Sequence, residues 1–335
     1  MPDVLDGAAC QTDAVSAASE SKSPANLKEG WIARADMISI LILTKDEECN
    51  LPKCIETVRW SDDIHVLDSN SSDSTVSIAT QLGAKVWHRE FDSFAQQQTW
   101  ALENIDFRYP WVFHIDADER ITPDLAKSIF AAVEKPGEMI AFRIQRRDFF
   151  LGTWLKHVQA TPYYLRLFRP EKMHYERIGH PVSVPQGPVS SIAGFLDHYP
   201  FSKGMAQWVD KHNFYSTQEA EQILADRALQ TSWSLRKCFF AETFEEKRRN
   251  QKQLFYRLPG RPIVKFFSLY FLKRGFLDGH AGFTYSVLMG FYEYLIVLKA
   301  REFAAQSIDR QAALRSGCTG EPSSSTVARS IGEVE

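Results

Sequence analysis

Trp111-Val112-Phe113-His114-Ile115-Asp116-Ala117-Asp118-Glu119-Arg120 joins an apolar run to three carboxylates that fall within four residues. The apolar part is short enough for a buried strand. If the strand continues to Asp118, alternation places Asp116 and Asp118 on one side at its carboxyl end, where open α/β sheets bind ligands. Two adjacent carboxylates repel each other, and Mg²⁺ or Mn²⁺ removes that repulsion while carrying substrate phosphates. The alternative is that these residues only cap the helix that begins near Thr122-Pro123.

The composition is that of a globular protein with one large or two modest domains. The chain has 335 residues, 44% of them apolar and 24% charged, and its net charge of −3 argues against a general nucleic-acid binder. Five cysteines form no Cys-x-x-Cys pair, which favours reduced thiols in the cytoplasm and argues against structural zinc. Residues 1–36 show no periodic apolar pattern and no secretory signal, so we expect a disordered N-terminal tail there and a loose C-terminal tail over 304–335.

Three strand and helix pairs precede the quoted stretch. Continuous β-branched and leucine runs such as Ile38–Leu43 are typical of strands buried on both faces. Each run leads through a polar loop into a helical pattern. Strands are expected at 38–43, 64–67, 84–87 and 111–118, and helices at 51–58, 74–83 and 93–102. Four strands alternating with three helices in about eighty residues predict the α/β class, with a Rossmann-like, mostly parallel sheet flanked by helices.

The polar ends of the first, second and fourth strands are predicted to meet at one edge of this sheet. Helix N-termini there offer N–H groups to anions, and Asp68 can accept from a base N–H or a ribose hydroxyl. The sequence has neither Gly-x-Gly-x-x-Gly nor Gly-x4-Gly-Lys-Ser/Thr, so dinucleotide and P-loop sites lack support. The edge is therefore a candidate nucleotide site in which a metal meets the phosphate charge.

Three motifs at these strand ends resemble the family-2 glycosyltransferases with a GT-A fold. They are Thr-Lys-Asp-Glu-Glu-Cys-Asn at 44–50, Val-Leu-Asp-Ser-Asn-Ser-Ser-Asp-Ser-Thr at 66–75 and Ile-Asp-Ala-Asp-Glu at 115–119. Within the family the chain is most similar to bacterial lipopolysaccharide-core β-glucosyltransferases and exopolysaccharide transferases, in segments 146–152, 165–169, 274–279 and 292–294. The resemblance extends from Met37 to Arg301 and implies a nucleotide-sugar-binding GT-A catalytic domain over 37–200.

The resemblance also implies roles for individual side chains at the edge. Donor binding falls to six of them: Thr44, Asp46 and Glu47 bordering the nucleotide, Asp68 contacting the base, Asp116 near the ribose and diphosphate, and Asp118 binding the metal. Sugar transfer needs charge neutralised on a leaving diphosphate, which a divalent cation supplies. Such family members invert the anomeric configuration in one displacement, and UDP-glucose is the favoured donor.

A second metal ligand is expected at His198, in Asp197-His198-Tyr199-Pro200, where a late histidine completes the metal site of related GT-A enzymes. Imidazole suits Mn²⁺ better than Mg²⁺, so Asp118 with His198 favours Mn²⁺. A purely structural histidine is the alternative. Lys203 and Arg166 are candidates to meet a phosphate, with solvent-facing positions as their alternative.

The catalytic base is not assigned by the resemblance, although inversion needs a carboxylate to take the proton of the attacking hydroxyl. Relatives commonly carry an aspartate after a proline where this chain has Pro162-Tyr163-Tyr164, and tyrosine, with a pKa of about 10, is a poor base. A His-Glu pair common in relatives is His180-Pro181 here. Asp148 and Glu176 are competing candidates, with an ordinary surface or hairpin carboxylate as the alternative for each.

Residues 201–303 are predicted to form a helical, amphipathic region that attaches to a membrane and receives the acceptor. From Arg236 to Arg301 there are thirteen Lys or Arg against five Asp or Glu. Basic residues among aromatic ones suit helices lying in the interface of an anionic leaflet. Ala281–Leu298 carries one charge in eighteen residues, so a single span stays open beside a monotopic attachment. The alternative is packing against the catalytic domain or a second subunit.

The sequence therefore predicts a metal-dependent inverting glycosyltransferase, peripheral or monotopic on the inner face of the bacterial plasma membrane. Its partners would be a UDP-sugar donor and a lipid-linked, lipopolysaccharide or exopolysaccharide acceptor, without nucleic acid, and a homo-oligomer is left open. One alternative is a sugar-phosphate nucleotidyltransferase, although such enzymes carry a basic, glycine-rich loop where residues 44–48 are acidic. The other is a catalytically degenerate nucleotide-binding scaffold, which the missing proline-linked aspartate favours and which Asp116 and Asp118 oppose.

Overall fold

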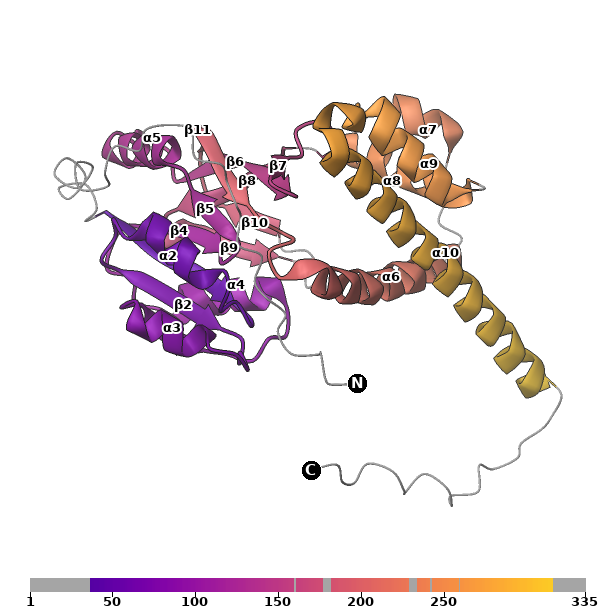
Figure 1. Ribbon diagram of the computed structural model, residues 1–335, viewed down its shortest axis with the longest axis horizontal. Helices are drawn as coiled ribbons and strands as arrows, with labels where there is room; N and C mark the ends of the chain where they lie inside the picture. The colour runs from indigo at the N-terminus through magenta and orange to yellow at the C-terminus, as the bar shows by residue number, and fades with distance from the viewer. Residues whose placement is uncertain are drawn as a thin grey trace, which may run out of the picture. The chain divides into compact units, whose positions relative to one another are not determined.

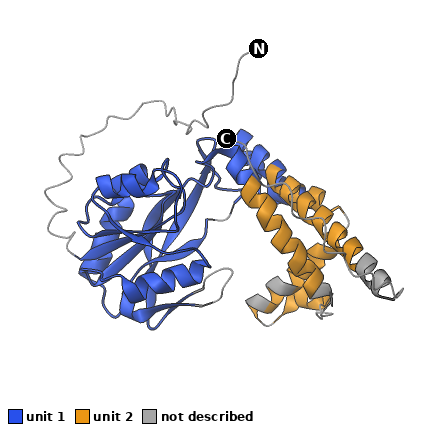
Figure 2. Ribbon diagram, turned by 90° about the horizontal axis from the view of Figure 1, so that it is seen from below, with its two compact units in different colours: residues 1–209, 267–287 blue, residues 210–266, 288–335 orange. Residues whose placement is uncertain are grey.

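The computed structural model (Figure 1) describes residues 37–159, 161–176, 182–228, 234–241, 243–258 and 260–315. Figure 2 shows two compact units. Unit 1 comprises the chain up to Val209 together with Phe267–Val287, and unit 2 comprises Asp210–Phe266 and the chain from Leu288 onward. The predicted tail 1–36 lies outside the described residues, and the functional boundaries expected at residues 200 and 303 stay predictions.

Unit 1 is built on a nine-stranded sheet with the order β3-β2-β1-β4-β8-β6-β11-β5, in which β7 pairs with β6 outside this path. The pairs β1–β2, β1–β4 and β2–β3 are parallel, so the four-stranded parallel part predicted from the sequence is confirmed, and the α/β class with it. The expected continuation of the fourth strand to Asp118 is wrong, because the chain turns at Ala117 and Asp118 before β5 begins. The strands are β1 (Ile38–Thr44), β2 (Ile64–Asp68), β3 (Lys85–His88), β4 (Trp111–Asp116), β5 (Glu119–Ile121), β6 (Ala141–Phe150), β7 (Thr153–Trp154), β8 (Tyr163–Phe168) and β11 (Val189–His198), with β9 (Met173–Glu176) and β10 (Val182–Pro185) in a separate two-stranded sheet.

Helices cover both faces of the parallel part, because its strands carry apolar side chains on both sides. Ile38, Ile40 and Ile42 are fully buried in one cluster with side chains of α2, α3 and α5, whereas Leu41 belongs to a second cluster with α4. Strand alternation produces this division. The helices are α2 (Leu51–Val58), α3 (Thr75–Gln81), α4 (Phe94–Asn104) and α5 (Pro123–Glu134).

The second half of the sheet brings the chain back to the end of β4. Strand β8 lies antiparallel between β4 and β6, β11 runs parallel to β6, and β11 is antiparallel to the short β5 that follows Asp118. In the β5–β11 pair, His198 lies opposite Glu119. Residues far apart in the sequence therefore meet at one edge of the sheet.

The C-terminal region is helical, as predicted. Its elements are α6 (Gly204–Ala228), α7 (Leu235–Phe240), α8 (Phe244–Arg257), α9 (Arg261–Phe267), a π-helical turn (Ser268–Leu272), a 3₁₀ turn (Gly275–Asp278) and α10 (Gly279–Arg315). Within unit 2, the buried Arg261 and Glu293 form an ion pair (Nη2 to Oε1, 2.9 Å). Part of the expected loose tail is helix instead, because the alanine-rich residues 304–315 favour continuation of α10. In the part of the chain that the structure describes, one stretch, Gly275–Ser307, is long and apolar enough to cross a membrane.

We expect Phe113→Ala to lower the free energy of unfolding by about 3–5 kcal/mol, since it leaves a cavity in the core. Phe113 is completely buried on β4. The matched control, Phe94→Ala, removes the same side chain from a position that is 47% exposed, and should cost less than about 1 kcal/mol. Urea unfolding followed by tryptophan fluorescence measures both variants. Equal losses would contradict the central position of β4.

Candidate functional site

Arg166 lies at the centre of the sheet edge formed by the end of β4. Its Nη2 is 2.6 Å from Asp116 Oδ2 and 2.6 Å from Glu119 Oε1. The backbone N–H of Asp116 donates to the other oxygen of Glu119 at 3.0 Å. Because Arg166 and Glu119 are both buried, each charge needs the other as its counter-charge. Arg166 reaches this place from β8, which pairs with β4.

The electrostatics of this cluster favour a charged Asp116 and a neutral His114. Burial raises the pKa of Asp116, but the Arg166 guanidinium outweighs it and holds that pKa below its usual range. Burial also raises the pKa of Glu119, and there Arg166 does not overcome it. Burial and Arg166 together lower the pKa of His114 to about 4. Arg166 thus holds two carboxylates, and its predicted contact with a phosphate stays a prediction.

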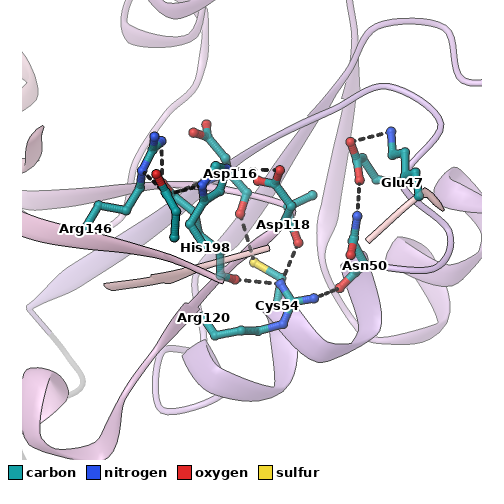
Figure 3. A network of polar contacts seen from close by, with 12 residues as sticks. Glu47, Asn50, Cys54, Asp116, Asp118, Arg120, Arg146 and His198 are labelled. Atoms are coloured by element: carbon teal, nitrogen blue, oxygen red, sulfur yellow. Dashed lines mark hydrogen bonds and ion pairs between the residues drawn. The ribbon is translucent and has the colours of Figure 1, made fainter. Parts of the chain in front are cut away.

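His198 lies between two carboxylates, and Figure 3 shows it beside Asp118. Its Nε2 is 3.2 Å from Asp118 Oδ2, and its Nδ1 is 2.5 Å from Asp148 Oδ1. Asp148 is 2% exposed, and it also lies 3.1 Å from Arg146 Nε and accepts a hydrogen bond from the Gln159 amide. Burial by itself would lower the pKa of His198, but Asp118 and Asp148 outweigh it and raise the pKa to about 9.

Asp118 and His198 fit a divalent cation. Metal-binding histidines are usually oriented by a carboxylate or carbonyl on the second ring nitrogen. Here Asp148 holds Nδ1 and leaves Nε2 facing Asp118. Over the described residues, no group of three or more His, Cys, Asp or Glu side chains could hold a metal by itself. Water and substrate oxygens would therefore complete the shell, as is usual for Mg²⁺ at phosphate sites.

Two loops at the same edge are joined by hydrogen bonds between their side chains and backbones. Asp68 accepts from Thr44 Oγ1 (2.9 Å) and from the N–H of Ser71 (2.8 Å). Asp46 accepts from the N–H of Ser72 at 2.7 Å, and its φ of 52° lies in the left-handed region that aspartate tolerates. Asp68 is completely buried, so in this structure it shapes its own loop, and its contact with a base stays a prediction.

Glu47 completes the group of predicted donor-binding residues. Its Oε1 is 2.6 Å from Lys203 Nζ, and its other oxygen accepts from Asn50 Nδ2 at 2.8 Å (Figure 3). Burial raises the pKa of Glu47, although Lys203 acts against it. Lys203, expected to face solvent or a phosphate, is therefore paired with a carboxylate of the first loop.

A hollow of about 570 Å³ lies next to the loop that carries Asp118. Arg120, which lines it, donates from Nη1 to the oxygen of Ala117 (2.7 Å) and from Nη2 to the oxygen of Asn50 (3.0 Å). The backbone N–H of Tyr199, which also lines the hollow, donates to the backbone oxygen of Asp118 at 2.9 Å. The lining combines polar and charged side chains with aromatic ones, and its volume lies in the range of ligand sites, which is about 300–1,000 Å³. The remaining lining residues are Cys49, Lys53, Glu56, Thr57, Phe149, Phe150, Leu151, Gly152, Phe201 and Ser202.

The structure brings most of the predicted site residues together at this edge. One predicted side chain lies outside the described residues, and two residues of the edge were not predicted. Glu176 ends β9, but its side chain lies outside the described part of the structure. The roles of Arg146 and Arg120 were missed: Arg146 pairs with Asp148 and Glu119, and Arg120 donates to the backbone oxygens of Ala117 and Asn50. Only the role of Arg146 was indicated by the sequence, because Arg146 precedes Asp148 by two residues on one strand and the two side chains therefore lie on the same face of the sheet.

Sequence comparisons agree with the chemistry of this edge. The family model described as glycosyl transferase family 2 matches residues 39–189, which contain all three strand-end motifs. The lipopolysaccharide core biosynthesis glycosyltransferase LpsC of Rhizobium meliloti is 27% identical over 272 residues, which are 78% of this chain and 91% of that protein. An uncharacterized glycosyltransferase of Rickettsia typhi is 25% identical over 284 residues, which are 81% of this chain and 88% of that protein.

Solved structures are more distant. Glucosyl-3-phosphoglycerate synthase from Mycobacterium tuberculosis, in complex with Mn²⁺, UDP and glucosyl-3-phosphoglycerate, is 19% identical with a TM-score of 0.30, over 39% of this chain and 51% of that chain. Mannosyl-3-phosphoglycerate synthase from Rubrobacter xylanophilus is 20% identical with a TM-score of 0.31, over 36% and 44%. The matches thus span about half of each solved chain or less. At TM-scores this low, the likeness establishes neither a shared fold nor a shared ligand.

We expect Arg166→Gln to lower the free energy of unfolding by about 3–5 kcal/mol at pH 7–8, because it leaves the buried Glu119 without its counter-charge. The same change removes the main cause of the lowered pKa of Asp116. A carboxyl whose pKa is lowered by folding contributes stability above its unfolded pKa of about 4, and that contribution disappears only as the pH falls below this value. The deficit of the variant should therefore persist down to about pH 4 and shrink below it. Urea unfolding at a series of pH values measures it, with exposed Arg143→Gln as the control. A deficit independent of pH would contradict the role of Arg166.

Proposed function

Because residues 39–189 form a glycosyl transferase family 2 domain, we propose that this glycosyltransferase moves a hexose, with glucose favoured, from a UDP-sugar to a lipid-linked or lipopolysaccharide or exopolysaccharide acceptor, with inversion and with a divalent cation. The observation that carries the proposal is the contact between Asp118 and His198 at the carboxyl end of the parallel strands. It supports a cation at the place where open α/β sheets bind ligands.

In this reaction the acceptor hydroxyl oxygen bonds to the anomeric carbon while the bond from that carbon to the diphosphate breaks. The hydroxyl proton passes to a carboxylate, and the nucleoside diphosphate leaves. When bound, the cation neutralises the charge on the leaving diphosphate. Asp118 and His198 would hold it, and Mn²⁺ is favoured by the imidazole. Asp116, held in its charged form by Arg166, borders the same position.

Asp148 is better suited to orient His198 than to act as the base. It is almost fully buried, one of its oxygens faces His198 and Arg146, and the other accepts from Gln159. An acceptor hydroxyl would have to displace one of these partners. Glu176 remains the other candidate base, with its side chain outside the described residues.

A membrane-associated acceptor is supported by two findings. A relative that aligns with most of this chain is named for lipopolysaccharide core biosynthesis. The C-terminal helices combine basic residues with exposed apolar ones, among them Phe240, Ile263 and Leu272. We place the enzyme on the cytoplasmic face of the bacterial plasma membrane, attached through residues 201–303 as a peripheral or monotopic protein.

The proposed function is tested by incubating the full chain with a panel of radiolabelled nucleotide sugars, Mn²⁺ and a membrane lipid extract. We expect label from UDP-glucose to enter the lipid fraction, and chelation of the metal to abolish the transfer. Folded protein that neither transfers nor hydrolyses any donor would overturn the proposal.

We expect Asp118→Ala to weaken Mn²⁺-dependent binding of UDP by about a hundredfold or more, since losing a ligand should cost at least as much as losing the partner of a ligand. Isothermal titration calorimetry measures it. Asp124→Ala, a change at a carboxylate whose side chain is 90% exposed, serves as the matched control and should bind as the wild type does. Unchanged binding by the Asp118 variant would move the metal elsewhere.

Asp148→Asn separates the two roles considered for this carboxylate. If Asp148 is the partner of His198, the substitution should weaken Mn²⁺ binding by about 10–100-fold. If Asp148 is instead the base, the substitution would abolish transfer and leave Mn²⁺ affinity unchanged. Titration of Mn²⁺ followed by electron paramagnetic resonance distinguishes these outcomes without relying on activity.

A further inference from the structure

Residues 267–287, which belong to unit 1 (Figure 2), present an apolar surface with positive charge, and we call them the apolar elbow. The most exposed apolar side chains in its two turns are Leu272 (82% exposed), Leu277 (54%), Phe271 (50%) and Phe276 (46%). Its two basic residues, Lys273 and Arg274, lie between them in the sequence and are exposed, whereas its one acidic residue, Asp278, is buried. The exposed side chains of the two turns are therefore all apolar or cationic.

An anionic bilayer is the partner whose chemistry fits this face. Leucine and phenylalanine favour the boundary between headgroups and acyl chains, and nearby cations are attracted to anionic headgroups. An exposed apolar patch of this kind marks an interaction site. A second copy of the chain would bring the same positive charge to the contact, which opposes self-association through this face.

One buried carboxylate ties the elbow to the rest of unit 1. Asp278 accepts hydrogen bonds from the backbone N–H groups of His157 (3.0 Å) and Val158 (2.8 Å), and His157 Nδ1 lies 2.6 Å from it. These contacts fix the loop that follows β7. The next residue in that loop, Gln159, donates to Asp148. A continuous chain of contacts thus runs from the elbow to the partner of the metal-binding histidine.

Close backbone packing makes this connection rigid. A Cβ added at Gly275 would lie 3.1 Å from Val158 Cβ, and one added at Gly282 would lie 2.0 Å from the oxygen of Gly275. The second approach excludes any side chain, so the 3₁₀ turn and the first turn of α10 meet at backbone distance. Tyr285 in α10 packs edge-on against Phe201, with 6.4 Å between the ring centroids, and burial and the Asp148 carboxylate raise its pKa.

We propose that the apolar elbow is the bilayer-contacting surface of this protein and that Asp278 is a positioning residue that connects this surface to the metal-binding edge. A membrane surface then holds residues 155–159 in the conformation that keeps Asp148 on His198. The positioning role rests on the proposed function, because it requires UDP and a divalent cation to bind at that edge. The bilayer contact does not.

The bilayer contact is tested by cosedimentation of the full chain with vesicles of phosphatidylglycerol and phosphatidylethanolamine. We expect replacement of both Leu272 and Leu277 by serine to weaken binding by about tenfold or more, since two apolar side chains no longer leave water. Phe91→Ser, at a position that is 48% exposed and lies outside residues 201–303, is the matched control and should bind as the wild type does. Equal binding by the double variant would overturn the contact. A dimer that the double variant abolishes, without vesicle binding, would assign the face to a second copy and also overturn it.

The positioning role is tested by titrating UDP in the presence of Mn²⁺, with and without the same vesicles. We expect vesicles to tighten UDP binding by about fivefold or more, and UDP with Mn²⁺ to tighten vesicle binding by the same factor, because coupling between two sites is reciprocal. Asp278→Asn should remove both effects and leave vesicle binding without UDP unchanged. Gln159→Leu breaks the same chain of contacts without touching the elbow and should do the same, with circular dichroism confirming that both variants fold.

The outcomes separate the two proposals. UDP binding that does not respond to vesicles in the wild type, or a response kept in both variants, would overturn the positioning role and leave the proposed function standing. Vesicle binding without any binding of UDP would overturn the proposed function, and the positioning role with it, and would support the bilayer contact alone.

Discussion

The pairing of Arg166 with two carboxylates is the interaction on which the rest of the edge depends. β4 ends at Asp116 and β5 begins at Glu119, so both carboxylates reach one place, and Glu119 is completely buried there. A buried carboxylate without a partner is strongly destabilising. The antiparallel β8 supplies the counter-charge from inside the sheet. The mixed pairing of the second half of the sheet is therefore what allows a cluster of acids to exist at the end of a parallel strand.

This pairing also determines which of the three carboxylates lies beside His198. Arg166 contacts Asp116 and Glu119, whereas Asp118 faces His198. Asp118 at Nε2 and Asp148 at Nδ1 raise the pKa of His198, in spite of burial that acts in the opposite direction. A proton and a divalent cation respond to the same potential, and binding of the cation requires the neutral imidazole. The position next to Asp118 is thus prepared for positive charge by the protein itself.

The parallel part of the sheet was predictable because the period and length of its apolar runs are local properties of the sequence. The pairing of Asp118 with His198 was reached only through the family resemblance, since nothing local connects β5 with β11. The pairing of Arg166 with two acids was not predictable, because an arginine in a strand has the same pattern whether it faces solvent or a buried acid. The sequence did not determine whether Asp148 is buried. Its burial is what makes Asp148 a partner for His198 rather than a surface carboxylate.

Four separated segments support the histidine at this edge, and the last of them lies in the C-terminal third of the chain. β11 carries His198, β6 carries Asp148, the loop after β7 carries Gln159, and the elbow carries Asp278. Asp278 acts on backbone N–H groups, and hydrogen bonds from backbone donors to a carboxylate fix position and direction more closely than apolar packing does. A displacement of the elbow would therefore be transmitted to the loop as a change in geometry and would not be absorbed by repacking of side chains. The exposed apolar turns of the elbow are for this reason also part of the structure that holds His198 and its partner Asp148 in place.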